Sequence, residues 1–151
     1  MTPEQFTKSL TKMSVDVKKF VHAAAPKIAG KTAAEFFTEN FAQRQGFLNR
    51  SVTPWQEVDR RRPKANGLPR TPRQQTEAGR KILFGKTRNL SRSIDYEVHE
   101  GGATVFSDVA YAAYHNDGDG AIPQRQFIGD SAELDKLVMA EIERKLKNII
   151  K

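Results

Sequence analysis

Three histidines are the residues of this sequence best suited to metal binding or proton transfer. His22, His99 and His115 fall in separate segments, and no two of them are three or four residues apart. A zinc site needs three or four ligands, commonly His, Cys and carboxylate side chains, held close together. The spacing therefore predicts no metal site, and we expect His115 to donate a hydrogen bond that fixes the turn after it.

The segment NDGDG, residues 116–120, has the oxygen-rich composition of a calcium-binding loop. Such a loop needs a bidentate acid at its twelfth position. Counting from Asn116 or Asp117, that position falls on an apolar residue. Counting from Asp119, it falls on Asp130, but apolar residues occupy ligand positions in between. The segment is therefore predicted to be a plain turn, and no cofactor is expected.

Motifs for nucleophilic catalysis and nucleotide binding are missing from the sequence. There is no G-x-S-x-G, no P-loop and no G-x-G-x-x-G. Ser91 and Ser93 have no base near them in the sequence. Asp95 and Glu97 lie two residues apart on an expected strand, where solvent-facing carboxylates are the common case. We therefore expect a protein that is not an enzyme, and keep a nuclease that depends on His115 as a third hypothesis.

The net charge of +7 is unevenly distributed along the chain. Residues 44–92 hold thirteen Lys and Arg against three Asp and Glu, a net charge of +10. Residues 93–151 carry a net charge of −5. The basic block can bind DNA, or it can bind the acidic part of a second copy. Few aromatic residues interleave the cations, so binding to DNA would be directed at the backbone and independent of sequence.

The length of 151 residues favours a single domain over residues 1–151. No cysteine is present, so disulfides and thiolate metal sites are excluded. No apolar run approaches the roughly 20 residues that a membrane span needs. The first ten residues lack the apolar core of a signal peptide. We therefore expect a soluble protein made inside a cell, with no membrane partner.

Apolar periodicity predicts helices at both ends of the chain. Residues 3–25 carry apolar side chains three and four positions apart, and Pro26 is expected to break or kink that helix. A second helical run should end near Gly46. A last amphipathic helix is expected after Asp130, which would cap it together with Glu133 in a capping box.

Residues 46–79 lose this periodicity and contain four prolines. We expect them to form an extended, basic, proline-rich arm with Trp55 as its one large anchor. Two alternatives are that Trp55 packs back on the core and that the arginines form a solvated loop. The residues expected to contact a neighbouring subunit or DNA are Trp55, Arg60, Arg61, Arg62, Arg70 and Arg73.

The part of the chain after the arm predicts strands. Alternating apolar and polar residues over 94–99 and 103–107, separated by Glu100-Gly101-Gly102, indicate a hairpin. One or two helical turns are expected in 109–115, and a proline-led edge strand in 123–128. The fold class is therefore α+β: N-terminal helices, a long basic arm, and a small, mostly antiparallel sheet packed on a C-terminal helix.

Four pieces of the sequence, in order, match a pattern that spans about residues 50–150. They are Trp55 in its basic stretch; Ile82, Leu83, Thr87, Leu90, Ser93 and Ile94; Tyr111, Ala112, His115 and Gly118; and Pro123, Arg125, Phe127, Ile128, Gly129 and Ser131 before a helix. Together they resemble the phage virion-morphogenesis, or tail-completion, family. The sequence departs from the family at Arg88, where the usual T-G-x-L turn has glycine.

The resemblance implies a structural virion protein at the head–tail junction of a tailed phage or prophage. Such neck proteins form homo-oligomeric rings, often of six subunits, around the DNA passage, and they contact the adjacent neck and tail proteins. The ring would assemble in the bacterial cytoplasm and could touch the passing DNA. The residues expected to act as scaffold, and not as a catalytic site, are Tyr111, Tyr114, His115, Arg125 and Phe127.

Overall fold

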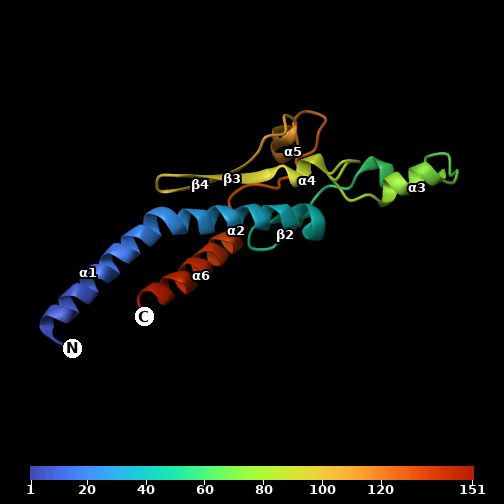
Figure 1. Ribbon diagram of the computed structural model, residues 1–151. Helices are drawn as coiled ribbons and strands as arrows, with labels where there is room; N and C mark the ends of the chain where they lie inside the picture. Colours follow the sequence, from blue (N-terminus) through green and yellow to red (C-terminus); the bar gives the residue numbers. More distant parts are fainter.

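A long helical rod dominates the computed structural model, which describes every residue from Met1 to Lys151 (Figure 1). The rod begins with a capping box, in which the Thr2 hydroxyl accepts a hydrogen bond from the backbone N–H of Gln5 at 3.2 Å. No helix is both long and apolar enough to cross a membrane. The segments of the rod are α1 (Pro3–Lys19), the π-helical η1 (Phe20–Ala24), α2 (Ala25–Glu39) and the π-helical η2 (Asn40–Arg44).

The rod continues past Pro26, but a π-helical turn lies directly before this residue, so the interruption of the first helix predicted there is confirmed. In an α-helix a proline leaves one carbonyl without its donor and clashes with the carbonyl four residues earlier. Here the turn before Pro26 is π-helical, and the N–H of Ala25 donates to the carbonyl of Phe20, five residues back. This wider turn places Pro26 at the start of α2, where a missing donor is tolerated.

The helix α2 is the central layer of the fold. The strands β3 (Ile94–His99) and β4 (Gly102–Ser107) form an antiparallel hairpin on one side of it. The helix α6 (Ala132–Ile149) runs along its other side (Figure 1). The hairpin confirms the strands predicted from the alternating pattern, and the α+β class is confirmed.

Residues 46–79, predicted to be an extended arm, contain short elements of regular structure. Its first part is a second antiparallel hairpin, in which Phe47 pairs with Thr53. Further along, short helices begin after tight turns. The elements outside the rod, the β3–β4 hairpin and α6 are β1 (Gly46–Leu48), β2 (Val52–Pro54), η3 (Asp59–Arg61), α3 (Pro72–Gly79), α4 (Asn89–Arg92) and α5 (Ala112–Asp117).

The edge strand predicted for residues 123–128 does not form. A strand needs backbone partners on a neighbouring strand, and here the donors are already used. The side-chain oxygen of Asn116 accepts from the N–H groups of Phe127 and Ile128, each at 2.9 Å. The N–H of Arg125 donates to the carbonyl of His115 at 2.7 Å. A folded connector therefore replaces the strand.

The cap of α6 is Ser131, not Asp130. The Ser131 hydroxyl accepts from the N–H of Leu134 at 3.2 Å and donates to the carbonyl of Leu48 at 2.8 Å. Shifting the cap by one residue removes Glu133 from the position that a capping box requires. The same hydroxyl thus begins α6 and ties it to β1.

Two hydrophobic clusters form the core. The first joins residues that are far apart in the sequence, with the Phe41 ring centroid 5.5 Å from that of Trp55 and 5.0 Å from that of Phe127. The members of the first cluster are Phe41, Trp55, Ile82, Leu90, Ala112 and Phe127, and those of the second are Ala33, Phe36, Phe37 and Phe47.

Side chains cap the C-terminal end of the rod, where the last carbonyls lack helical donors. Arg44 donates to the carbonyl of Phe36 at 2.7 Å, and the Gln45 amide donates to the carbonyl of Phe41. Lys81 reaches the carbonyl of Ala42 from outside the rod. Gln45 itself takes the left-handed conformation, with φ of 49°.

Two buried polar contacts join this end of the rod to the rest of the chain. The Gln45 side-chain oxygen accepts from the N–H of Ile82 at 2.6 Å. Asn40, fully buried, donates to the carbonyl of Phe127 at 3.0 Å. The end of the rod therefore also positions both the segment after the arm and the connector.

The β3–β4 hairpin lies so close to α2 that Gly30 has no room for a side chain. A Cβ at this position would lie 2.3 Å from Cδ2 of Tyr96 and 3.0 Å from Cβ of Ala103. Glycine within a helix ordinarily destabilises by roughly 0.5–1 kcal/mol relative to alanine. Close packing against the hairpin explains why glycine occupies this position.

We predict that Gly30→Ala lowers the free energy of unfolding by about 1–2 kcal/mol, because overpacking outweighs the gain in helix propensity. Denaturant unfolding followed by circular dichroism measures this. The loss should shrink when Gly30→Ala is combined with Tyr96→Ala. The control is Gly79→Ala, since nothing lies within 4 Å of a Cβ there. Stabilisation by Gly30→Ala would contradict the close approach.

Candidate functional site

A basic projection, residues 56–81, extends past the C-terminal end of the rod (Figure 1). It carries eight Lys and Arg and three Asp and Glu. It begins directly after Trp55, turns through η3 and returns along α3 toward Ile82. Its two ends are thus fixed to the first core cluster, because Trp55 and Ile82 are both members of it.

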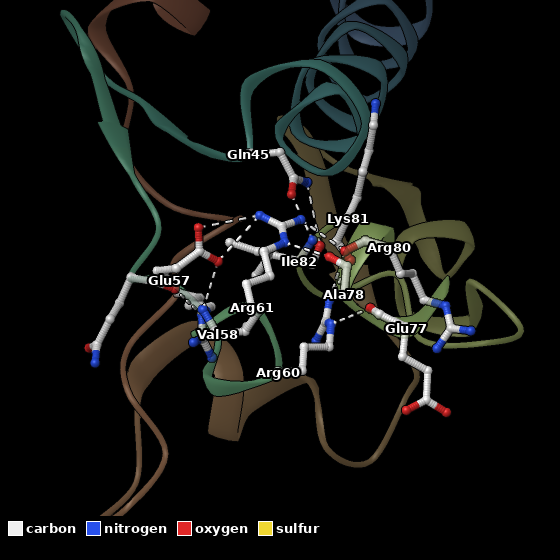
Figure 2. A network of polar contacts seen from close by, with 12 residues as sticks. Gln45, Glu57, Val58, Arg60, Arg61, Glu77, Ala78, Arg80, Lys81 and Ile82 are labelled. Carbon is white, nitrogen blue, oxygen red and sulfur yellow. Dashed lines mark hydrogen bonds and ion pairs between the residues drawn. The ribbon is translucent and has the colours of Figure 1, made fainter. Parts of the chain in front are cut away.

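Arg60 and Arg61 hold the base of this projection together (Figure 2). Arg60 donates to the carbonyls of Glu77, Arg80 and Lys81 at 2.9, 3.0 and 3.1 Å. Arg61 donates to the carbonyls of Ala78 and Arg80 at 2.9 and 2.8 Å. A guanidinium offers five donors in a fixed fork, which suits several carbonyls that lie close together. These two arginines therefore serve the fold of the projection itself.

Trp55, expected among the contact residues, is instead part of the core. Only 7% of its surface is exposed, and its indole N–H donates to the carbonyl of Gln126 at 2.7 Å. Burial of a large aromatic ring is strongly favourable, so this side chain is not free to meet a partner. The alternative prediction, that Trp55 packs back on the core, is confirmed.

The outward-facing cations of the predicted set are Arg62 and Arg73. Their side chains are 63% and 80% exposed, and each forms a local ion pair, with Asp59 at 3.1 Å and Glu77 at 3.2 Å. Exposed pairs of this kind contribute roughly 0.3–0.5 kcal/mol, so they are readily exchanged for a partner's charge. Arg70 is less available, because it donates to the carbonyl of Arg62 at 2.7 Å.

An acidic surface lies on the other part of the chain. Residues 93–124 contain six Asp and Glu and no Lys or Arg. All six are exposed, and none takes part in an ion pair within the chain. They are Asp95, Glu97, Glu100, Asp108, Asp117 and Asp119. Basic and acidic surfaces are thus separated in the fold as they are in the sequence.

The predicted scaffold residues divide into a buried and an exposed group. Phe127 and Arg125 are 1% and 8% exposed, and Arg125 donates to the carbonyl of Gln56 at 3.0 Å. Tyr111 and Tyr114 are 42% and 50% exposed. The first two therefore hold the connector against the base of the projection, whereas the two tyrosines face solvent and contribute little to the core.

His115 does not fix the turn with its side chain, contrary to the prediction. Its Nδ1 is buried and has no hydrogen-bond partner, while its backbone carbonyl and the side chain of Asn116 hold the turn. Burial, followed by the positive charge of Arg125, lowers the pKa of His115 below its ordinary value of 6.5. The imidazole is therefore neutral at pH 7 in the folded chain.

Burial also lowers the pKa of Arg125, and partial burial together with the charge of Arg61 lowers that of Arg60. Glu57 has a lowered pKa, because it accepts from the N–H of Val58 and lies beside Arg61. The positive charge at the base of the projection therefore exceeds the negative charge of the carboxylates there.

Sequence reasoning missed three polar residues that position these surfaces: Asn40, Asn116 and Ser131. The available signal was weak, since each is an ordinary helix or turn residue whose partner lies far along the chain. Arg88 is a clearer case. It has φ of 57°, the left-handed region, at the position where the resembling family has glycine.

The histidines do not converge with carboxylates, and no group of three such side chains could hold a metal ion. Comparison with protein-family models, with curated proteins and with solved structures gave no match. The function is therefore inferred from the resemblance and from the surfaces described above.

We predict that Arg60→Ala loosens the base of the projection, because the three hydrogen bonds that Arg60 donates to carbonyls are lost. Hydrogen–deuterium exchange measured by mass spectrometry should be faster over residues 57–85. The matched control is Arg62→Ala, which removes an exposed cation and one surface ion pair. Equal exchange in the two variants would show that Arg60 does not stabilise the projection.

We predict a pH dependence of stability that comes from His115. Because its pKa is lower in the folded chain than in the unfolded chain, its contribution is present above pH 6.5 and is lost as the pH falls toward the folded pKa. Unfolding measured between pH 5 and 8 (a range around that pKa) should show a shallower slope in His115→Gln. A slope in His115→Gln equal to that of the wild type would show that His115 does not contribute to the pH dependence.

Proposed function

We propose that this chain is a structural virion protein of a tailed phage or prophage, a tail-completion component that forms a homo-oligomeric ring at the head–tail junction. The observation that carries the proposal is the exposed apolar stripe of α1. A long amphipathic helix whose first half leaves large apolar side chains exposed is suited to assembly. The protein acts as a structural component and not as an enzyme.

The stripe consists of apolar residues spaced three and four apart along α1. The helix has no buried residue. The large side chains of Phe6 and Leu10 are 54% and 48% exposed. An amphipathic helix normally buries such a face against another element. An exposed apolar face of this length is typical of a surface for protein association. The members of the stripe are Phe6 and Leu10, which are exposed, and Met13 and Val17, which are half-buried.

A second copy of the chain is the partner that the charges favour. The exposed cations of the projection and the unpaired acids of residues 93–124 are complementary, and they lie on different parts of one chain. They cannot satisfy each other within a single copy without rearrangement. A contact between the basic surface of one subunit and the acidic surface of the next is head-to-tail, and it closes into a ring when the rotation allows.

The residues that carry the family resemblance also support the proposal. Each of the four sequence pieces contributes to the first core cluster, through Trp55, through Ile82 and Leu90, through Ala112 and through Phe127. The left-handed Arg88 fits a turn in which the family uses glycine. The pattern that carries the resemblance therefore coincides with core residues of this chain.

A sequence-independent DNA-binding protein is the alternative, and the exposed Arg62 and Arg73 favour it. It differs from the ring proposal in one observable property, which is the mass of the protein without DNA. The apolar stripe of α1 has no role in binding phosphates, so it does not support this alternative.

We predict that light scattering shows a mass several times the 17.0 kDa of one chain in the absence of DNA. Leu10→Asp should lower this mass, because it places a charge in the apolar stripe. The control Lys8→Asp changes the net charge more but leaves the stripe intact. A wild-type monomer that shifts duplex DNA at physiological salt would overturn the ring proposal and support the alternative.

The contact between charged surfaces is tested by a charge swap. The double variant Arg62→Glu and Arg73→Glu should reduce the mass, and adding Glu97→Lys and Glu100→Lys should restore part of it. Arg60 and Arg61 are left unchanged, since reversing them would disrupt the base of the projection. A mass that does not respond to either set of changes would remove these charges from the interface.

A further inference from the structure

A cavity of about 260 Å³ lies where the base of the projection meets the connector. Its polar lining includes Arg60, Asn89, Tyr111, His115 and Arg125, which come from four separate segments of the chain. Arg60, Asn89 and Tyr111 are exposed, so the cavity opens to solvent. A water molecule occupies about 30 Å³ of liquid, so the space holds a small ion together with water.

The cations of this cavity have no carboxylate partner. Neither Arg60 nor Arg125 forms an ion pair, although Arg125 is only 8% exposed. The two acids whose charges act on Arg125 already have partners. Glu57 pairs with Arg61 at 3.2 Å, and Asp59 pairs with Arg62 at 3.1 Å. A buried cation without a counter-charge is unfavourable unless an anion compensates it.

Free hydrogen-bonding capacity is present at the same place. Arg125 uses its Nε for the carbonyl of Gln56, which leaves both terminal nitrogens without a partner in the chain. The buried Nδ1 of His115 has no partner either. Guanidinium forks bind carboxylate and phosphate groups through two parallel hydrogen bonds. Both uncommitted groups belong to residues that line the cavity.

The loop on the far side of the cavity is conformationally strained. Leu83, which lines it, has φ of 61°, a left-handed conformation that a leucine rarely adopts. Gly85, also in the lining, has φ of 57°. Residues held in such conformations require support from their surroundings, and they are frequent at ligand sites.

We propose that this cavity is a binding site for a small oxyanion group, a carboxylate or a tetrahedral anion, with Arg125 as its main ligand and Arg60 and His115 beside it. The site does not depend on ring formation. The anion is either free in solution or is the carboxylate of an acidic residue from a second copy. Both sources present the same chemistry to Arg125.

Sulfate is the probe, because it keeps its double negative charge throughout the pH range in which histidine titrates. The imidazole signals of His115 are recorded by NMR as sulfate replaces chloride at constant ionic strength. A saturable shift is expected, together with a rise in the pKa of His115, because a bound anion favours the imidazolium. The measurement is made on the wild-type protein and on the Leu10→Asp variant, so that an occupying second copy is also removed.

Arg125→Gln should weaken sulfate binding about tenfold or more, because a charged hydrogen-bonding partner is lost. The control is Arg144→Gln, on α6 and paired with Glu141 at 2.6 Å, which should bind like the wild type. His115→Leu is the second variant and removes no hydrogen bond made by Nδ1. Sulfate should raise its melting temperature less than that of the wild type, beyond the general salt effect that both share.

The mass of the protein in solution distinguishes the two sources of the anion. A fall in mass when sulfate replaces chloride assigns the site to a carboxylate of a second copy, and an unchanged mass with saturable binding assigns it to a free anion. The proposal is overturned if His115 shows no saturable response in either protein, or if Arg125→Gln responds as the wild type does.

Discussion

The fold depends on how the carbonyl groups at the end of the long rod are satisfied. Three carbonyls near this end accept from side chains, that of Phe36 from Arg44, that of Phe41 from Gln45 and that of Ala42 from Lys81. Those contacts bring in the segment at Ile82, and Asn40 brings in the backbone of Phe127. Ending one helix thus assembles the first core cluster and fixes both ends of the projection.

The residues that carry the family resemblance are, in this chain, residues of the fold. Arg125 and Phe127 are buried, Ser131 begins α6, and Arg88 takes the left-handed turn. A pattern of this kind records which chains can build this core. The surfaces that would distinguish one assembly from another lie elsewhere, on the stripe of α1, on the projection and on the acidic residues.

Local patterns predicted part of this structure well. The β3–β4 hairpin follows from alternation and a glycine turn, both of which are short-range properties. The strand at 123–128 failed because Asn116 takes its backbone donors, a contact that no periodicity reveals. Arg60 looked like a solvated cation, because its carbonyl partners are 17 to 21 residues away. The cavity at the base of the projection left no pattern in the sequence, since its lining comes from separate segments.

The π-helical turn at η1 has a geometric consequence for the direction in which the rod presents its faces. Each residue of an α-helix turns the chain by about 100°, and a π turn holds roughly one residue more. The stripe of α1 is therefore rotated about the axis relative to the layers around α2. Deleting one residue from Phe20–Ala24 would remove the π turn and place Pro26 inside an α-helical turn, where its ring clashes with the carbonyl four residues earlier. It would also rotate Phe6 and Leu10 about the helix axis, so in the proposed ring the angle between subunits would depend on this one inserted residue.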